Sequence, residues 1–348
     1  MKAAQIVNKN ERYTLCDVPA PTAGPGQLLI QVKAAGFCHT DIMVSHGDFG
    51  SPYPITGSHE PAGIVVAVGE GVQGWQVGDR AASLNKVTEC GECHDCKHLD
   101  SAFCPNGNLA GLHTDGSFAE YFVSLAKNSA KVPESMPWEV AAPMPCAGIT
   151  IYKAIRKAGL QPGGVLAISG LGALGHIGVQ MAKAMGLFVV GIDARPGPLE
   201  LCAGLALAPD VLIDASKTSA EEAVALIDKK VKSTFSEERP SGVDAVVVTA
   251  EVPPALRFAF DITKRHGTYV LVSQPEELRI PFRELIFKNV TVVGSLQGNG
   301  ADLQETIEFV TQHDIQVHTR TWAGLEQVGP MWDEQVSPGQ VGKNVVLF

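Results

Sequence analysis

A run of four cysteines, Cys90, Cys93, Cys96 and Cys104, is the densest group of reactive side chains in the sequence. Their spacing is Cys-x2-Cys-x2-Cys-x7-Cys, in a stretch that contains turn-forming Gly and Pro. Four thiolates complete the tetrahedral coordination of a zinc ion and leave no position for a substrate. The spacing therefore predicts a structural zinc site. Two alternatives stay open: an iron–sulfur cluster, which uses the same ligands with a different last interval, and a set of free or oxidised cysteines.

A second set of metal-binding side chains is scattered along the chain. Cys38 lies in GFCHTD, His59 in GSHEPAG and Cys146 in PMPCAGIT. Two thiolates and one imidazole form one of the three-ligand sets that hold a catalytic zinc and leave its fourth position open. A lone Cys is also a common small hydrophobe. From spacing alone, a catalytic zinc set and three unrelated residues remain alternatives.

A glycine-rich segment indicates a nucleotide site. Gly170, Gly172 and Gly175 form a GxGxxG motif between an apolar run and a helix-like run. Such glycines allow a tight turn and a close approach of the backbone to a pyrophosphate. Asp193 ends the next apolar run, where an acidic residue typically binds the adenosine ribose. This pattern favours NAD over NADP, although the nearby Arg195 keeps NADP as an alternative.

Alternating apolar and helix-like runs surround this motif from residue 165 onward. The strand-like runs are 165–170, 187–193, 211–214, 244–250 and 267–273, and the helix-like runs are 173–186, 221–233 and 254–263. Strands that are apolar throughout are typical of a parallel sheet covered by helices on both faces. We therefore expect an α/β fold with a Rossmann-type, doubly wound parallel sheet.

The rest of the chain has a different pattern of apolar and turn-forming residues. The N-terminal part consists of short β-rich runs separated by Gly, Pro and Gly-Asp turns, which is typical of an irregular, mostly antiparallel domain. Short strands return near the C-terminus around one helix-like run. We expect residues 1–150 and 286–348 to form the zinc-binding catalytic domain and residues 151–285 to form the nucleotide-binding domain.

The composition excludes several classes of function. The chain of 348 residues has a formal net charge of -10 and no run of Lys or Arg, so nucleic acid is not an expected partner. The start of the sequence lacks an apolar signal segment, and no apolar stretch reaches the length of a membrane span. We therefore expect a cytoplasmic protein without membrane association. Its eight cysteines would serve thiolate chemistry rather than disulfides.

Several longer strings closely resemble the zinc-dependent medium-chain alcohol dehydrogenases, particularly the yeast type. They are GFCHTDIMVSHGD, GSHEPAGIVVAVGEGV, GWQVGD, CGECHDC and CAGITIYKAI, and the resemblance runs to the C-terminal VGKNVVLF. It implies a GroES-like catalytic domain beside the Rossmann domain. It also implies that Cys38, His59 and Cys146 bind the catalytic zinc, that Glu60 can approach this metal, and that Asp41 orients His59.

The resemblance assigns further residues to the cofactor and to the proton path. Thr40 matches the hydroxyl that hydrogen-bonds the alcohol and passes its proton toward the cofactor ribose. Val272 matches a position whose backbone lies beside the nicotinamide amide. Lys343 stands where an Arg usually contacts the pyrophosphate, and Lys lacks the bidentate fork of Arg. His39 can assist the same phosphates.

The sequence departs from the family pattern near the substrate. Met43 occupies a position where many relatives carry a proton-relay histidine, and His46 lies three residues further on. In the pocket, Phe49 stands where a Trp is common, and Asn85 falls near another pocket Trp. These changes suggest a wider, more polar site than one built for ethanol.

These features lead us to expect an enzyme. An open zinc site and a nicotinamide favour reversible hydride transfer between NAD and a primary alcohol, or a secondary alcohol. The resemblance also implies a homo-oligomer, as a tetramer or a dimer. Two alternatives remain: a polyol or secondary-alcohol dehydrogenase of the same superfamily, which Cys146 disfavours, and a non-catalytic NAD-binding or zinc scaffold protein.

Overall fold

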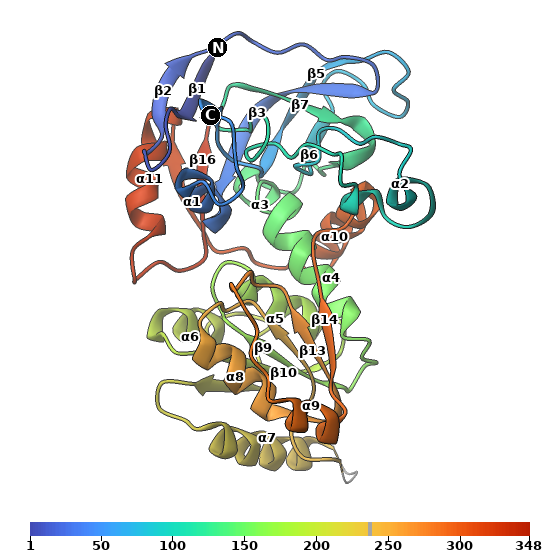
Figure 1. Cartoon of the computed structure of the whole chain (residues 1–348), viewed down its shortest axis with the longest axis vertical. Coiled ribbons are helices and arrows are strands. Elements are labelled where there is room, and N and C mark those ends of the chain that lie inside the picture. Colours follow the sequence, from blue (N-terminus) through green and yellow to red (C-terminus); the bar gives the residue numbers. More distant parts are fainter. Residues whose placement is uncertain (236–238) are drawn as a thin grey trace. The chain divides into compact units, whose positions relative to one another are not determined.

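The structure, a computed structural model, describes residues 1–235 and 239–348 (Figure 1). Its internal contacts divide the chain into two compact units. Unit 1 comprises Met1–Ile149, Gln297–Gln312 and His318–Phe348, and unit 2 comprises Thr150–Leu296 and His313–Val317. No helix among the described residues is both long enough and apolar enough to cross a bilayer.

Unit 2 contains a parallel sheet whose strands, within the described residues, follow the order β11-β10-β9-β12-β13-β14. The strands are β9 (Val165–Ser169), β10 (Phe188–Asp193), β11 (Val211–Asp214), β12 (Val243–Val248), β13 (Thr263–Leu271) and β14 (Thr291–Gly294). In sequence terms this is the order 3-2-1-4-5-6 of dinucleotide-binding domains. Every residue of β9 and β10 is buried, as expected for strands with helices on both faces. The expected Rossmann-type fold is confirmed.

Helices that connect these strands pack against the sheet (Figure 1). They are α5 (Gly175–Ala184), α6 (Pro196–Ala203), α7 (Ala220–Thr234), α8 (Pro253–Ile262) and α9 (Phe282–Lys288), and α4 (Ile149–Lys157) precedes the first strand. The start of α7 illustrates how the sequence defines an end. Ser219 accepts a hydrogen bond from the Glu222 backbone while the Glu222 carboxylate accepts one from the Ser219 backbone, which is a capping box.

Unit 1 is mostly antiparallel. One sheet has the order β2-β1-β4, and the other has the order β15-β16-β3-β5-β6-β8, with β7 also paired to β3. The strands are β1 (Lys2–Ile6), β2 (Thr14–Asp17), β3 (Gln27–Phe37), β4 (Ile55–Thr56), β5 (Pro61–Val68), β6 (Arg80–Ser83), β7 (Tyr121–Leu125), β8 (Ser129–Lys131), β15 (Thr319–Ala323) and β16 (Lys343–Leu347). The C-terminal β16 thus pairs with β3 of the N-terminal segment.

Short helices complete unit 1. The α-helices are α1 (His39–His46), α2 (His94–His98), α3 (Trp138–Ala141), α10 (Gly300–Gln312) and α11 (Val328–Gln335). The 3-10 helices are η1 (Ser101–Phe103), η2 (Ala126–Asn128) and η4 (Leu325–Gln327), and η3 (Met144–Gly148) is a π-helical turn. Much of the core lies around β3, whose side chains are mostly buried.

The second domain boundary differs from the sequence expectation. The boundary at residue 286 assigned the apolar run containing β14 to the catalytic domain. In the structure β14 forms parallel pairs with β13, for example Thr268 with Thr291, and unit 1 resumes only at Gln297. An apolar strand pairs with whichever sheet edge is open to it, so its sequence alone does not say which sheet it joins.

Candidate active site and metal centres

Three segments of unit 1 bring Cys38, His59 and Cys146 together. Cys38 directly follows β3 and is the N-cap residue of α1. His59 lies between β4 and β5, and Cys146 lies in the π-helical turn η3. A π-helical turn is rare and often occurs at functional sites. The long strand β3 and the short loop before β5 therefore position the first two side chains, and an irregular turn positions the third.

The donor atoms of this cluster converge in the way a tetrahedral metal requires. The Sγ atoms of Cys38 and Cys146 are 3.9 Å apart, and His59 Nε2 lies 3.3 Å from Cys146 Sγ. Zinc–thiolate bonds of about 2.3 Å place two sulfurs about 3.8 Å apart in a tetrahedron. One ligand atom from each of these residues and from Glu60 lies within 4.8 Å of the others. The residues present therefore fit a zinc ion with three protein ligands.

Protonation in the cluster is shared between neighbours. A hydrogen bond with Cys146 lowers the pKa of Cys38 well below its ordinary value, and the same contact raises the pKa of Cys146 well above it. Burial alone would lower the pKa of His59, but the negative charges of Cys38, Asp41 and Glu60 together outweigh burial and raise it to about 9. Metal ligation requires deprotonated thiols and a neutral imidazole, so zinc binding here would release protons.

Glu60 and Lys343 form a buried ion pair next to the cluster. Lys343 Nζ donates to Glu60 Oε1 at 2.6 Å and to the Phe37 carbonyl at 3.0 Å. Glu60 Oε2 is buried without a hydrogen-bond partner among the described residues. Gly36 leaves the necessary space, since a Cβ there would lie 1.9 Å from Glu60 Oε2. Lys343, expected to contact a pyrophosphate, instead directs its ammonium group to Glu60 and is 3% exposed.

Asp41 is also arranged differently from the expectation that it orients His59 directly. Its carboxylate accepts hydrogen bonds from the backbone of Cys38 (2.8 Å), the backbone of Ser58 (2.7 Å) and the Tyr13 hydroxyl (3.0 Å). His59 Nδ1 is buried and has no partner among the described residues. Asp41 thus ties together the two segments that carry Cys38 and His59. The role of Tyr13 was not predicted, because no motif links it to this site.

The remaining residues of α1 follow the cluster. Cys38 Sγ and Thr40 Oγ1 are 3.6 Å apart, which places this hydroxyl beside the proposed ligands. His39 is exposed at the first position of the helix, Met43 is half-buried, and His46 is exposed at its last position. The structure therefore brings Thr40 into the cluster, whereas His39 and His46 face solvent.

The two residues expected to line a substrate pocket are both in unit 1. Phe49 is partly buried and packs against the hydrophobic core of this unit. Asn85 follows β6 and is 6% exposed, and its Oδ1 has no hydrogen-bond partner among the described residues. A buried amide oxygen without a donor is costly, so Asn85 is suited to accept a hydrogen bond from a ligand or from water.

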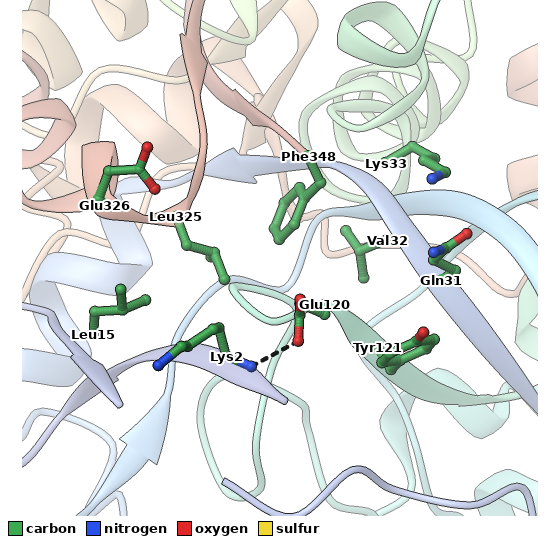
Figure 2. A pocket seen from close by; sticks show the side chains of 10 residues that line it. All are labelled: Lys2, Leu15, Gln31, Val32, Lys33, Glu120, Tyr121, Leu325, Glu326 and Phe348. Atoms are coloured by element: carbon green, nitrogen blue, oxygen red, sulfur yellow. Dashed lines mark hydrogen bonds between the residues drawn. The ribbon is translucent and has the colours of Figure 1, made fainter. Parts of the chain in front are cut away.

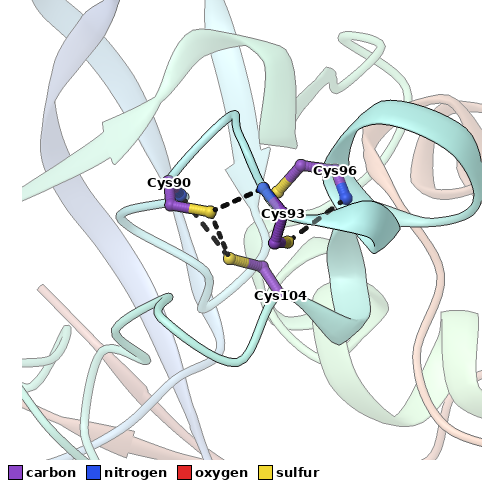
Figure 3. Close-up of side chains that lie close together, drawn as sticks. All are labelled: Cys90, Cys93, Cys96 and Cys104. Carbon is purple, nitrogen blue, oxygen red and sulfur yellow. Dashed lines mark hydrogen bonds between the residues drawn. The ribbon is translucent and has the colours of Figure 1, made fainter.

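The four-cysteine cluster forms a second metal centre in unit 1 (Figure 3). Its sulfur atoms lie within 4.8 Å of one another, and the Sγ atoms of Cys90 and Cys104 are 3.6 Å apart. Backbone N–H groups of Glu92 and Cys93 lower the pKa of Cys90 to about 6, which favours a thiolate there. Lys86 Nζ donates to the carbonyls of Ser101 and Ala102 in η1, which anchors the cysteine lobe, the segment from Cys90 to Cys104. The donor set therefore fits a closed zinc site.

The glycine motif in unit 2 joins β9 to α5. Gly170 has a φ of 99°, a left-handed conformation that favours glycine, and a Cβ there would lie 2.5 Å from Thr249 Oγ1. Gly175 packs as closely, because its Cβ would lie 1.9 Å from the Gly170 carbonyl oxygen. A Cβ on Gly172 would meet only the Arg195 guanidinium, at 3.4 Å. The first and third glycines are therefore required by packing, whereas the second leaves an open approach to the backbone.

Asp193 closes this loop at the end of β10. Its carboxylate accepts hydrogen bonds from the Leu171 backbone at 2.8 Å and from the Arg195 backbone at 3.0 Å. Arg195 Nε also donates to Asp193 Oδ1 at 3.1 Å. Val272 lies directly after β13, and its backbone N–H donates to the Val248 carbonyl. Asp193 and Val272 thus stand at the carboxyl ends of two strands of the same parallel sheet, β10 and β13, which is the edge where dinucleotides bind in this architecture.

A pocket of about 320 Å³ lies elsewhere in unit 1 (Figure 2). Residues of β1, β2, β3 and β7 line it together with the C-terminal Phe348. Its charges are already engaged in part, because the Lys2 ammonium pairs with Asp17 and the Lys2 backbone donates to Glu120. None of the sequence-predicted site residues lines this pocket, so we assign it no part in the chemistry.

Comparison with protein families matches two segments of the chain. Residues 24–134 match the alcohol dehydrogenase GroES-like domain, and residues 173–312 match the zinc-binding dehydrogenase domain. An alcohol dehydrogenase from Geobacillus stearothermophilus is 34% identical over 350 residues, which cover 100% of this chain and 99% of that protein.

Solved structures agree with these matches. The alcohol dehydrogenase of Aeropyrum pernix is similar with a TM-score of 0.87 and 28% identity, over 100% of both chains. A thermostable alcohol dehydrogenase from Pyrobaculum aerophilum, solved with cobalt and zinc bound, has a TM-score of 0.83 and 26% identity, over 100% of this chain and 99% of that one.

Proposed function

Since the chain belongs to the zinc-dependent medium-chain alcohol dehydrogenase family, we propose that it catalyses reversible hydride transfer between an alcohol and NAD, with two zinc ions per chain. The observation that carries the proposal is the convergence of Cys38, His59 and Cys146 in unit 1. Three ligands leave one position for substrate, whereas the four-cysteine site is closed and structural.

The two bound groups supply the chemistry that side chains lack: zinc acts as a Lewis acid toward the alcohol oxygen, and NAD accepts the hydride from the carbinol carbon. The protein's own groups handle binding and protons. The Thr40 hydroxyl, beside Cys38 in the structure, accepts the proton of the alcohol and passes it on. Met43 has no ionisable group, so His46 at the end of α1 is the histidine available to carry that proton to solvent. Glu60 is the carboxylate that can approach the catalytic metal.

The cofactor belongs to unit 2. The backbone of the loop from Gly170 to Gly175 receives the pyrophosphate at the start of α5, and Asp193 binds the ribose hydroxyls. Val272 offers backbone groups to the nicotinamide amide, and the family resemblance assigns His39 to the phosphates. Arg195 already engages Asp193, so ribose binding has to displace part of that contact. A carboxylate at this position repels a 2′-phosphate, which favours NAD.

The substrate is a functionalised or aromatic alcohol. The side-chain carbonyl oxygen of the buried Asn85 has no hydrogen-bond donor among the described residues. It therefore favours a substrate that donates a hydrogen bond to it, either directly or through a water molecule. Phe49 provides an apolar contact smaller than a Trp. A polyol dehydrogenase is the second candidate, and the presence of Cys146 among the ligands disfavours it.

A homo-oligomer is the proposed assembly. Strand β14 is the last strand of the six-stranded sheet in the described part of unit 2, and an unpaired sheet edge readily pairs with another chain. The helix α9 beside β13 exposes three large apolar side chains, Phe282, Ile286 and Phe287. We place the protein in the cytoplasm, since none of its eight cysteines forms a disulfide in the structure.

A substrate panel combined with metal analysis tests this function. Primary, secondary and aromatic alcohols are offered with NAD and with NADP, while elemental analysis counts zinc. We expect activity with NAD and two zinc ions per chain. Cys146→Ala should retain one zinc and lose activity, whereas Cys16→Ala, outside both clusters, should retain both. Pure protein that is active without zinc would refute the proposal; two zinc ions without activity on any alcohol would favour a scaffold role.

A further inference from the structure

Two histidines of α2 stand one turn apart on the lobe that carries the four cysteines. Residues four apart on a helix lie on the same face, and the ring centroids of His94 and His98 are 5.1 Å apart, with an interplanar angle of 43°. Both residues are exposed. Neither belongs to the cluster of four thiols. The helix therefore presents two neighbouring imidazoles to solvent.

This arrangement suits a divalent transition-metal ion. Two histidines at positions i and i+4 of a helix can ligate the same ion from one face. Imidazole nitrogen is a good ligand for zinc, copper and nickel. The surrounding sequence is acidic, because Glu92, Asp95 and Asp100 outnumber Lys97 in this stretch. Four thiolates around one divalent ion would carry a net negative charge, so the local electrostatic field favours the binding of a further cation.

We propose that His94 and His98 form a surface site for one exchangeable divalent ion, such as Ni²⁺ or Zn²⁺, separate from both cysteine-containing sites. Two imidazoles fill part of the coordination sphere, and water completes it. The site is independent of the dehydrogenase reaction, since neither histidine contributes to the proposed zinc ligands or to the cofactor loop. One consequence is that protein kept in excess zinc should bind three ions per chain, of which one leaves on dialysis.

Nickel titration of the zinc-loaded protein tests the site. Protein without an affinity tag, with its zinc content measured beforehand, is titrated with NiCl₂ by calorimetry in a non-coordinating buffer. We expect one Ni²⁺ per chain. His94→Gln and His98→Gln should each weaken nickel binding at least tenfold, because chelation requires both rings. Two controls should bind as the wild type does: Lys97→Gln on the same helix, and His266→Asn, an exposed histidine of unit 2.

Two results would overturn the proposal. If each single variant kept nickel affinity within twofold of the wild type, the two rings would not act together. If zinc left the protein in step with nickel uptake, nickel would occupy a cysteine site instead. Retained zinc and unchanged circular dichroism in both variants establish that they are folded, so weakened nickel binding then reports on the imidazoles themselves.

Discussion

Glu60 and Lys343 meet in the interior of unit 1, where neither charge has access to water. Their 2.6 Å contact joins β16 to the loop before β5. Removing one member of such a pair leaves an uncompensated buried charge, which costs about 3–5 kcal/mol. Losing both charges costs much less. This pair therefore fixes the position of Glu60 beside the proposed zinc ligands.

Lys343→Met tests that role. We expect a large fall in thermal stability and easier loss of one zinc, with partial recovery of both in the double variant Glu60→Gln/Lys343→Met. Lys2→Met is the matched control, because its ion pair with Asp17 is exposed to solvent and such pairs contribute little to stability. Thermal melts and zinc analysis of the four proteins give the answer. Equal losses in Lys343→Met and Lys2→Met would contradict the assigned role.

Tyr13 acts on the same site through Asp41. Its hydroxyl donates to a carboxylate that also holds the backbones of Cys38 and Ser58. Tyr13→Phe removes one of these three donors from a buried carboxylate, at a cost of about 1–3 kcal/mol. We expect faster zinc release to a chelator in Tyr13→Phe than in the wild type.

The control for this prediction is Tyr53→Phe. The Tyr53 hydroxyl donates to the Val44 carbonyl of α1 at 2.5 Å, so the same atom is removed near the same helix without touching Asp41. Zinc release should be unchanged in this variant. Similar release rates in both variants would mean that general loosening of α1, and not the Asp41 contact, controls zinc retention.

The sequence predicted which residues could ligate a metal but not what holds them. Cys38, His59 and Cys146 could be selected because each lies in a string that resembles a family motif. Tyr13 lies in none of these strings, and Gly36, although it opens GFCHTD, shows no role of its own there, since both roles arise from contacts that the fold creates. Lys343 illustrates the same limit. The sequence predicted a cationic side chain that contacts a pyrophosphate, whereas in this structure the Lys343 ammonium group contacts Glu60. Contacts across distant segments depend on strand pairing, which residue type alone does not encode.

At the scale of elements, the loop between β9 and α5 separates two uses of glycine. Gly170 is required by its own backbone conformation and by Thr249, whereas Gly172 has an open surface apart from Arg195. We predict that Gly170→Ala lowers the melting temperature of the protein without cofactor. Gly172→Ala should leave that temperature nearly unchanged but weaken NAD binding, because a methyl group then stands where the pyrophosphate approaches.

Melting curves and NAD titrations of both variants test this separation. If Gly172→Ala bound NAD as tightly as the wild type, the pyrophosphate would not approach this part of the loop. A destabilised Gly172→Ala would instead show that the second glycine is also required by packing. The Gly170→Ala variant serves as the reference for a packing defect in the same loop.

Strand and helix runs in unit 2 were largely predictable, and the exceptions have physical causes. Apolar runs and their spacing located β9, β10, β11 and β12, because buried parallel strands are apolar throughout. The strand β13 begins at Thr263, earlier than the apolar run that signals it, since its first residues are polar and partly exposed. The helix α9 was not predicted, because its seven residues span only about two turns, which is shorter than the window over which a helical period can be recognised.

At the scale of the whole molecule, exposed apolar side chains in unit 2 indicate a protein interface. The side chains of Phe282, Ile286 and Phe287 on α9 are 69%, 64% and 71% exposed. Val292 of β14 is 40% exposed, on a strand that ends its sheet. Soluble monomers rarely expose apolar side chains in such a group, and groups of this kind commonly mark protein interfaces. A second copy of the chain is the partner that the open strand edge favours.

Ile286→Glu is the variant that tests this interface. A buried, unpaired carboxylate at an interface costs several kcal/mol, so we expect the wild type to sediment as a multimer of the 36.8 kDa chain and the variant to dissociate at micromolar concentration. Leu226→Glu is the matched control, because Leu226 is an exposed apolar residue of the same unit, on α7 and outside this group. Sedimentation velocity distinguishes the species. A monomeric wild type would contradict the proposed oligomer. An Ile286→Glu protein that stays assembled would show that the interface lies elsewhere. Dissociation of Ile286→Glu, but not of Leu226→Glu, would identify α9 as part of the contact.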